Sequence, residues 1–169
     1  YVQKARIRKT QYFFKNRSGF LWELSREIEQ LKKRAARQGF KFAVRLNGTS
    51  DLSFDRFKVT GECTILDLHP DVQFYDYTKV PNRLENKRKN YHLTFSYSGK
   101  NAPECAQAMN AGVNVAYVFK NSIPKKYYGL KVVDGDKHDL RFLDPQGVII
   151  GLVAKGRGRK VNQSGFISV

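Results

Sequence analysis

The feature that most constrains the fold is the alternation of two kinds of segment along the first two-thirds of the chain. Runs rich in β-branched and aromatic residues predict strands at 42–46, 72–77, 91–95 and 113–119. Apolar residues at helical spacing predict helices at 3–15, 18–39, 65–68 and 102–111. Alternating strands and helices favour a largely parallel sheet with packed helices. We predict an α/β fold whose sheet is a partial or distorted barrel, with an open sheet as the alternative.

The helix predicted over 18–39 is the most regular of these elements. Its apolar residues recur every three or four positions and form one stripe, made of Leu21, Leu24, Ile28, Leu31 and Ala35. Ser18 suits the N-cap, and Gly39 suits the position just past the C-terminus.

The last third of the chain carries a different pattern. Three short apolar runs predict strands at 130–133, 140–143 and 148–153. The turn sequences Asp134-Gly135-Asp136 and 144–147 separate them, which indicates antiparallel hairpins. We predict one domain overall, composed of a basic helical region at 1–40, an α/β core at 41–154 and a basic Gly/Arg tail at 155–169.

Composition excludes several classes of protein. No apolar run approaches the roughly 18–20 residues of a membrane helix, and no secretory signal opens the chain. Cys63 and Cys105 have no paired spacing, so we expect two buried free thiols in a reducing compartment, the host cytoplasm. No phosphate loop, dinucleotide fingerprint or nucleophile elbow is present in the sequence, so no complete catalytic motif identifies an enzyme.

The net charge of +16 favours a polyanionic partner. Residues 1–45 hold 13 Lys or Arg and 3 Asp or Glu, whereas residues 46–85 hold 4 and 7. We therefore predict a nucleic-acid interface that contacts mainly phosphates. Its expected residues lie in the N-terminal helices, in the cluster after Pro81-Asn82 and in the tail: Lys4, Arg6, Arg8, Lys9, Lys32, Lys33, Arg34, Arg37, Lys87, Arg88, Lys89, Arg157, Arg159 and Lys160.

Polar residues gather where the predicted strands end, and parallel α/β folds bind ligands beyond the carboxyl ends of their strands. The candidate pocket residues are Arg45, Asn47, Ser50, Asp51, Asp76, Thr78, Lys79, Ser96, Asp134, Asp136 and His138. The carboxylates and imidazole within 134–139 could hold a divalent metal, although Asp-Gly-Asp is also a common hairpin turn. We predict no cofactor, with a divalent metal as the alternative.

Three stretches, at 45–51, 70–79 and 134–145, resemble a family of uncharacterised phage and plasmid proteins. More distantly, the Arg-x-Asn…Ser-Asp and Phe-Tyr-x-Tyr-Thr patterns resemble phage proteins with radical-SAM-like barrels. Members of both groups usually carry a cysteine-rich segment upstream of this region, and the sequence given holds no such segment. Because the chain opens at Tyr1 with a sequence typical of a protein interior, we expect a fragment or a processed product.

Three functional hypotheses follow. The first is a phage-encoded basic protein that binds nucleic acid. The second is a fragment of a radical-SAM-like or metal-dependent enzyme whose pocket lies at the strand ends. The third is an inhibitor of an acidic host protein, because such a surface also attracts a chain of this charge. No membrane partner is expected.

Overall fold

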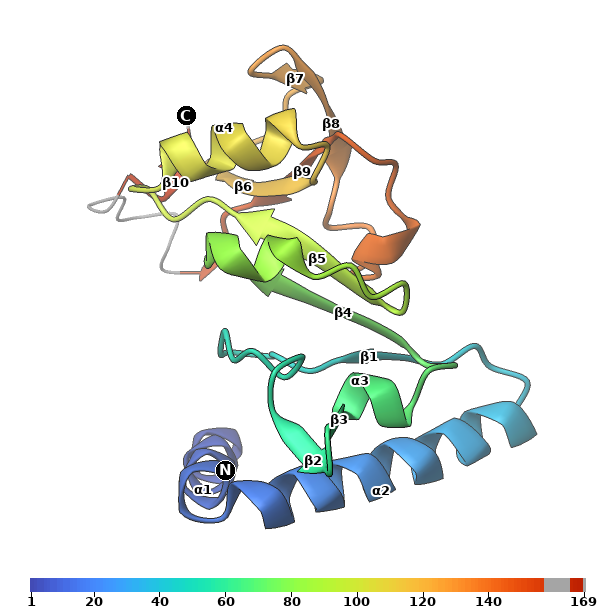
Figure 1. Cartoon of the computed structure of the whole chain (residues 1–169). Coiled ribbons are helices and arrows are strands. Elements are labelled where there is room, and N and C mark those ends of the chain that lie inside the picture. Colours follow the sequence, from blue (N-terminus) through green and yellow to red (C-terminus); the bar gives the residue numbers. More distant parts are fainter. Residues whose placement is uncertain (157–164, 169) are drawn as a thin grey trace. The chain divides into compact units, whose positions relative to one another are not determined.

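The computed structural model describes residues 1–156 and 165–168 (Figure 1). Its helices are α1 (Val2–Lys15), α2 (Arg17–Arg37), α3 (Ile65–Leu68) and α4 (Ala102–Asn110), with the 3₁₀ helices η1 (Pro81–Glu85) and η2 (Arg141–Leu143). The chain forms two compact units, where the sequence predicts one domain. Unit 1 comprises Tyr1–Val44 and Ser53–Phe74, and unit 2 comprises Arg45–Leu52 and Tyr75–Val169.

Unit 1 contains α1, α2, α3 and the antiparallel pair β2 (Lys58–Thr60) and β3 (Cys63–Thr64), together with the first two residues of two strands of the main sheet. Phe13 of α1 is buried against the rings of Phe20, Phe54 and Phe57. These aromatic contacts come from segments far apart in the sequence and form the centre of the unit.

Helix α2 begins at Arg17, two residues earlier than an N-cap at Ser18 would allow. The prediction that Ser18 is the N-cap is wrong, because the side chain of Asn16 accepts a hydrogen bond from the Gly19 backbone N–H at 2.9 Å. The predicted stripe is confirmed at Leu21 and Ile28, which are buried, whereas half of Leu31 is exposed.

The predicted α/β class is confirmed. The main sheet has the strand order β1-β4-β5-β6-β9-β8-β7, and β10 pairs with β6. Its strands are β1 (Ala43–Arg45), β4 (Gln73–Thr78), β5 (Tyr91–Ser96), β6 (Val115–Phe119), β7 (Lys126–Tyr127), β8 (Leu130–Asp134), β9 (Ile149–Val153) and β10 (Ile167–Ser168). Within the described residues the sheet is open and does not close into a barrel.

Strands β5, β6, β9 and β8 are parallel to one another, in that spatial order. The longest register joins β6 to β9, from Val115 opposite Ile149 to Phe119 opposite Val153. Helix α4 packs on β5 and β6, and it buries Cys105 and Ala108 against Phe95 and Val115. Because the four strands are parallel, their carboxyl ends lie at one edge of the sheet.

The structure corrects two details of the last third. Antiparallel strands are present as β7 and β8. The hairpin predicted around Asp134-Gly135-Asp136 is wrong, because β8 and β9 are parallel. The chain between them therefore runs back to the edge of the sheet where these strands begin. The strand predicted at 140–143 is also wrong: η2 forms there and buries the guanidinium of Arg141, which a solvent-facing strand could not do.

The two cysteines are free, and Cys105 is buried as expected. The expectation for Cys63 is wrong, because it lies exposed at the start of β3. Among the described helices, none combines the length and the apolar character needed to cross a membrane.

Gly151 marks the tightest packing in the middle of β9. A Cβ atom at this position would lie 2.5 Å from Ile123 Cγ2 and 2.8 Å from Val132 Cγ1. We expect Gly151→Ala to lower the free energy of unfolding by about 1–3 kcal/mol through overpacking. Urea denaturation measures this loss. Gly112→Ala would not serve as a control, because Gly112 has a positive φ and an alanine there would be strained. The control is Ala154→Gly, which removes a methyl group just after β9 and adds no volume. The comparison separates the cost of overpacking at Gly151 from the cost of any substitution near the end of this strand.

Candidate functional site

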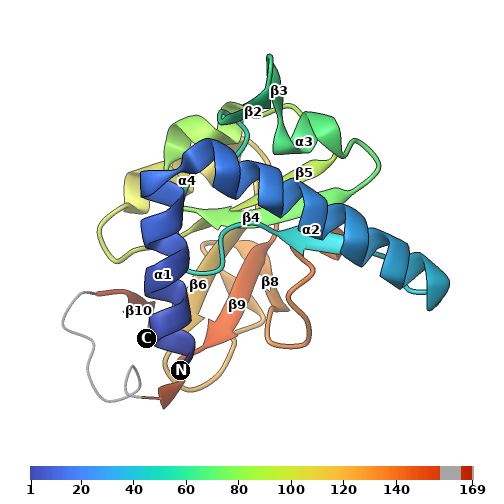
Figure 2. The ribbon, with the colours of Figure 1, turned by 90° about the horizontal axis from the view of Figure 1, so that it is seen from below.

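Helix α1 carries five Lys or Arg residues and no Asp or Glu. An α-helix turns by about 100° per residue, so Lys4, Arg8 and Lys15 project from one face, opposite the buried Phe13. All three are exposed, and within the described part of the chain none of them pairs with an acidic side chain. They form a row about 16 Å long. We call these three residues the α1 row; the helix that carries them, α1, is labelled in Figure 2.

Helix α2 continues the basic surface of unit 1, but part of its charge is neutralised. Lys32 lies 3.0 Å from Asp71 and 3.3 Å from Glu29, and Lys33 lies 3.4 Å from Glu29. The hydrogen bond from Lys32 holds the pKa values of Glu29 and Asp71 below their ordinary values. Arg34 and Arg37 are exposed in the last turns of the helix, where their charge also suits the helix dipole.

The remaining predicted phosphate contacts lie outside unit 1. The Pro81-Asn82 segment forms η1, and the cluster after it has exposed Lys87 and Lys89 and a half-buried Arg88. The predicted tail contacts Arg157, Arg159 and Lys160 lie outside the described residues. Arg6 and Lys9 are exposed on α1, but the turn of about 100° per residue places them on other faces of the helix than the α1 row.

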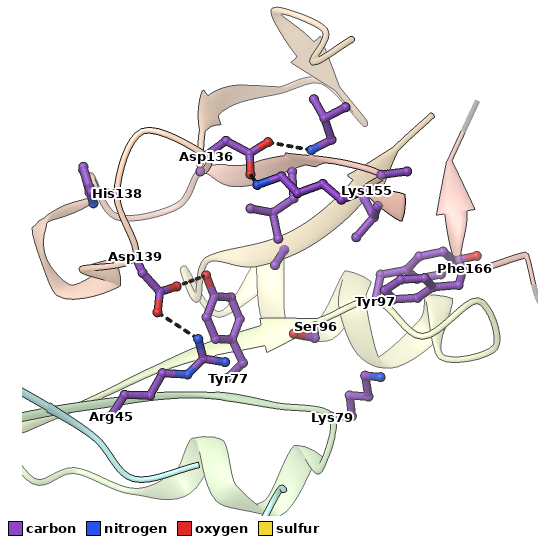
Figure 3. Close-up of a pocket in the computed structure, with 16 residues that line it drawn as sticks. Arg45, Tyr77, Lys79, Ser96, Tyr97, Asp136, His138, Asp139, Lys155 and Phe166 are labelled. Atoms are coloured by element: carbon purple, nitrogen blue, oxygen red, sulfur yellow. Dashed lines mark hydrogen bonds and ion pairs between the residues drawn. The ribbon is translucent and has the colours of Figure 1, made fainter. Parts of the chain in front are cut away.

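A cavity of about 670 Å³ opens in unit 2 at the carboxyl ends of the strands (Figure 3). We call it the strand-end cavity. Its lining comes from the ends of β1, β4, β5, β6 and β9, from the loop after β8 and from the residue before β10. Of the candidate pocket residues, the lining includes Arg45, Lys79, Ser96, Asp136 and His138. Its volume falls in the range of small-molecule sites.

Two ion pairs line the strand-end cavity. Arg45 Nη1 donates to Asp139 Oδ2 at 2.8 Å, and the guanidinium lies 4.7 Å from the centre of the Tyr77 ring. The Tyr77 hydroxyl donates to the other oxygen of Asp139. Burial is the main cause that raises the pKa of Tyr77, so the phenol stays protonated and serves as a donor.

The second ion pair joins Asp136 to Lys155 at 2.8 Å. Asp136 also accepts the backbone N–H of Val153 at 2.9 Å. The Lys155 hydrogen bond and then the Val153 N–H lower the pKa of Asp136. Asp136 is therefore ionised, and each of its carboxylate oxygens already accepts a hydrogen bond from the protein.

A smaller cavity of about 330 Å³ shares three lining residues, Tyr77, Lys79 and Ser96, with the strand-end cavity. Its other lining residues, Thr49, Ser50, Asp51 and Thr78, follow β1 or end β4. Sequence reasoning placed Ser50, Asp51 and Thr78 in the pocket, and the structure puts them at this second cavity.

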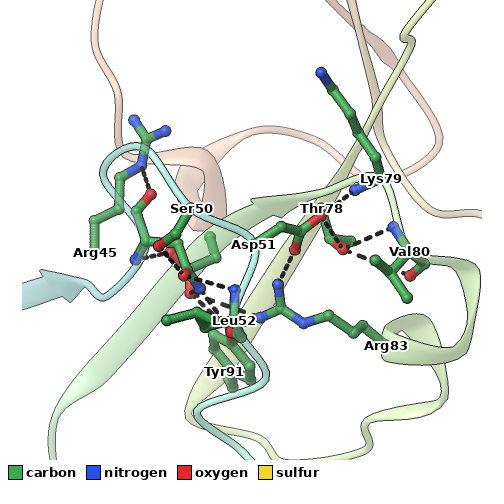
Figure 4. A network of polar contacts seen from close by, with 11 residues as sticks. Arg45, Ser50, Asp51, Leu52, Thr78, Lys79, Val80, Arg83 and Tyr91 are labelled. Atoms are coloured by element: carbon green, nitrogen blue, oxygen red, sulfur yellow. Dashed lines mark hydrogen bonds and ion pairs between the residues drawn. The ribbon is translucent and has the colours of Figure 1, made fainter. Parts of the chain in front are cut away.

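Beneath the small cavity lies a buried polar network (Figure 4). Asp76, fully buried in β4, accepts the backbone and side-chain N–H groups of Asn47 at 2.7 and 2.9 Å and the Tyr91 hydroxyl at 2.7 Å. Burial raises the pKa of Asp76 above its ordinary value, and these hydrogen bonds oppose the shift. Asn47 and Asp76 hold the loop after β1 and do not line either cavity.

The network contains one buried cation, Arg83 of η1. Its guanidinium donates to Asp51 and to the Tyr91 hydroxyl, and it lies 3.8 Å from Asp76. Asp51 in turn accepts the backbone N–H of Lys79 at 2.7 Å. The network thus fixes the backbone that carries Lys79 between the two cavities.

The predicted metal ligands do not converge. Asp134 accepts the Asp136 backbone N–H at 3.0 Å, Asp136 pairs with Lys155, and Asp139 pairs with Arg45. In the described ranges, 1–156 and 165–168, no three His, Cys, Asp or Glu side chains gather as a metal site. His138 lies at the cavity wall, 3.9 Å from Asp144.

Sequence reasoning missed two kinds of site residue, cavity-lining aromatics and buried arginines. Tyr97 and Phe166 line the strand-end cavity, and Arg83 and Arg141 are fully buried cations. Tyr97 directly follows Ser96, so the rule about strand ends could have found it. Arg83 and Arg141 carry no local sequence signal, because only tertiary contacts bury them.

The family model of Gene product 88 matches residues 1–169. This match is consistent with the phage-type family that the sequence resembles, and it gives no similarity to radical-SAM proteins. No curated protein and no solved structure matches the chain.

Proposed function

The chain belongs to the Gene product 88 family, and from its own surface we propose that it is a phage-encoded protein that binds the phosphate backbone of nucleic acid through α1 and α2. The α1 row is the observation that carries the proposal. Three exposed cations on one helix face, without acidic partners in the described chain, offer a linear set of contacts to a phosphate polymer.

The cations of α2 contribute to this surface unequally. Arg34 and Arg37 are exposed, while Lys32 is held by Asp71 and Glu29. A phosphate that recruited Lys32 would first have to displace two carboxylates. The contacts of α2 therefore come from its last two turns, and Lys32 serves mainly to join α2 to the segment that carries Asp71.

The experiment compares nucleic-acid binding of the wild-type chain with that of Lys4→Gln/Arg8→Gln/Lys15→Gln across a salt series. The slope of log K against log salt is negative, and each lost phosphate contact reduces its magnitude by about 0.9 for double-stranded DNA and about 0.7 for single strands. We expect the triple variant to have a slope smaller in magnitude by about 2 to 3 and to bind every sequence more weakly. Fluorescence anisotropy with single- and double-stranded DNA and RNA measures both quantities.

The matched control is Lys100→Gln/Lys120→Gln/Lys125→Gln, which removes the same charge from exposed positions of unit 2. We expect it to keep most of the wild-type slope. Equal losses in the two triple variants would show that net charge acts without a defined interface. Binding of an acidic protein but of no nucleic acid would instead support the inhibitor hypothesis and reject this proposal.

A further inference from the structure

We propose that the strand-end cavity binds a small molecule that carries a planar ring and one anionic group, a phosphate or a carboxylate. This site lies within unit 2 and uses none of the cations assigned to nucleic-acid binding. The proposal names the chemical class of the ligand of this pocket and does not include a reaction.

The charges of the lining select an anion. Three cations and two carboxylates line the cavity, but Arg45 is paired with Asp139 and Lys155 with Asp136. Within the described lining, Lys79 is the cation whose charged group has no acidic partner. An anionic ligand group can therefore contact Lys79 Nζ without breaking an existing ion pair.

The surroundings of Lys79 supply further donors. Ser96 lines both cavities with Lys79, and in the described structure its hydroxyl has no protein partner. Thr49, from the loop after β1, lines the smaller cavity. The negative charge of Asp51 does not oppose an anion here, because Asp51 is bound by Arg83, by the Thr78 hydroxyl and by the Lys79 backbone N–H.

Aromatic side chains next to Lys79 account for the planar ring. Lys79 Nζ lies 5.4 Å from the centre of the Phe166 ring, and Tyr97 lies close by in the lining (Figure 3). Tyr97 is held in place by the buried Tyr117, with ring centres 4.8 Å apart and planes inclined by 21°. A ligand ring that packs on these side chains brings an attached anionic group to Lys79.

The lining also separates two ends of the cavity. Figure 3 shows Lys79, Ser96, Tyr97 and Phe166 together, away from the paired Arg45 and Asp139. The lining also includes the apolar residues Val118 and Leu152. This arrangement matches a ligand that places its ring and its anionic group at the Lys79 end, with its remaining atoms against the apolar lining.

The test uses two pairs of probes on the full chain, adenosine monophosphate with adenosine and benzoate with benzamide. We expect at least one anionic probe to bind about tenfold or more tightly than its neutral partner, the effect of one charge-assisted contact. The pair that shows this difference tells a phosphate from a carboxylate ligand. Inorganic phosphate, which has no ring, is expected to bind more weakly than the favoured probe.

Variants test the assigned residues by isothermal titration calorimetry. Lys79→Gln removes the ammonium and keeps the backbone N–H that Asp51 accepts, so the anionic probe should lose about tenfold in affinity while the neutral probe is unchanged. Phe166→Leu should weaken both members of the pair by the same factor. Lys100→Gln, exposed and outside the lining, is the control with the same loss of charge and should bind like wild type.

Three results would overturn the inference: neutral probes that bind as tightly as anionic ones, phosphate alone binding as tightly as adenosine monophosphate, or no binding by either pair. A failure here is distinguishable from a failure of the nucleic-acid proposal. The α1-row variant should retain probe binding, and Lys79→Gln should retain the salt dependence of nucleic-acid binding.

Discussion

Replacing Asp76 by alanine is expected to lower the free energy of unfolding by about 3–5 kcal/mol, because it removes one of the two carboxylates near the buried Arg83 and leaves three buried donors without their acceptor. Two N–H groups of Asn47 and the Tyr91 hydroxyl lose their acceptor, and Arg83 loses one of its two carboxylates. All four groups lie where water does not replace the lost contacts. Chemical denaturation followed by circular dichroism measures the change.

Asp136→Ala is the matched control for this variant, since it also removes a carboxylate of unit 2 that pairs with a cation. Its partner Lys155 is 77% exposed, so water solvates the lysine after the change, and we expect a loss of about 1 kcal/mol or less. Comparable losses for the two variants would contradict the buried network as the main support of the loop after β1. If that network holds the loop, Asp76→Ala also weakens binding at the strand-end cavity, which shares Lys79 with it.

Arg141→Met is expected to destabilise the chain by a similar amount, about 3–5 kcal/mol. The guanidinium is fully buried; its Nη2 donates to the His138 carbonyl, and its Nε lies 3.3 Å from Asp144 Oδ2. Methionine fills a comparable volume, but it leaves the Asp144 carboxylate, 7% exposed, without a cation. The loss therefore comes mainly from the stranded charge, and thermal or chemical unfolding measures it.

The double variant Arg141→Met/Asp144→Leu separates charge from packing. Replacing both members of a buried ion pair by apolar residues is often neutral, so we expect the double variant to be more stable than Arg141→Met alone. A double variant that loses the sum of the two single effects would show that the pair acts through packing and not through its charge.

Arg141 also connects stability to the cavity. A Cβ atom on Gly135, a lining residue, would lie 2.7 Å from Arg141 Nη1. The buried guanidinium thus lies directly behind this part of the wall. Only a residue without a side chain allows the wall and the guanidinium to approach this closely.

The alternation of strands and helices was sufficient to predict the α/β class and most element positions from the sequence. Strand β4, for instance, was expected at 72–77 and forms at Gln73–Thr78. Such elements can be predicted from the sequence, because burial of one face or of a whole strand imposes a local pattern of apolar residues. The pair β2–β3 and the strand β7 were missed, since two- and three-residue strands carry too few positions to show a period.

The candidate pocket was likewise predicted only in part from the sequence. The rule that parallel strands end at one edge was sufficient to select Lys79, Ser96 and Asp136, which line the strand-end cavity. It also selected Asp76 and Asn47, which the structure buries in a network instead. A sequence pattern specifies that a polar residue follows a strand, but not whether its side chain faces the cavity or the interior.

The sequence by itself determined the class of fold, the basic helices and the edge of the sheet where polar groups gather, because these depend on local periodicity and on charge along the chain. Tertiary structure alone decided that β8 and β9 are parallel, that Arg83 and Arg141 are buried, and that the Lys79 ammonium lies beside Phe166 with no acidic partner among the described residues. The physical reason is that the partner of a charged group is chosen by distance in space, and Arg45 meets Asp139 across 94 positions of sequence.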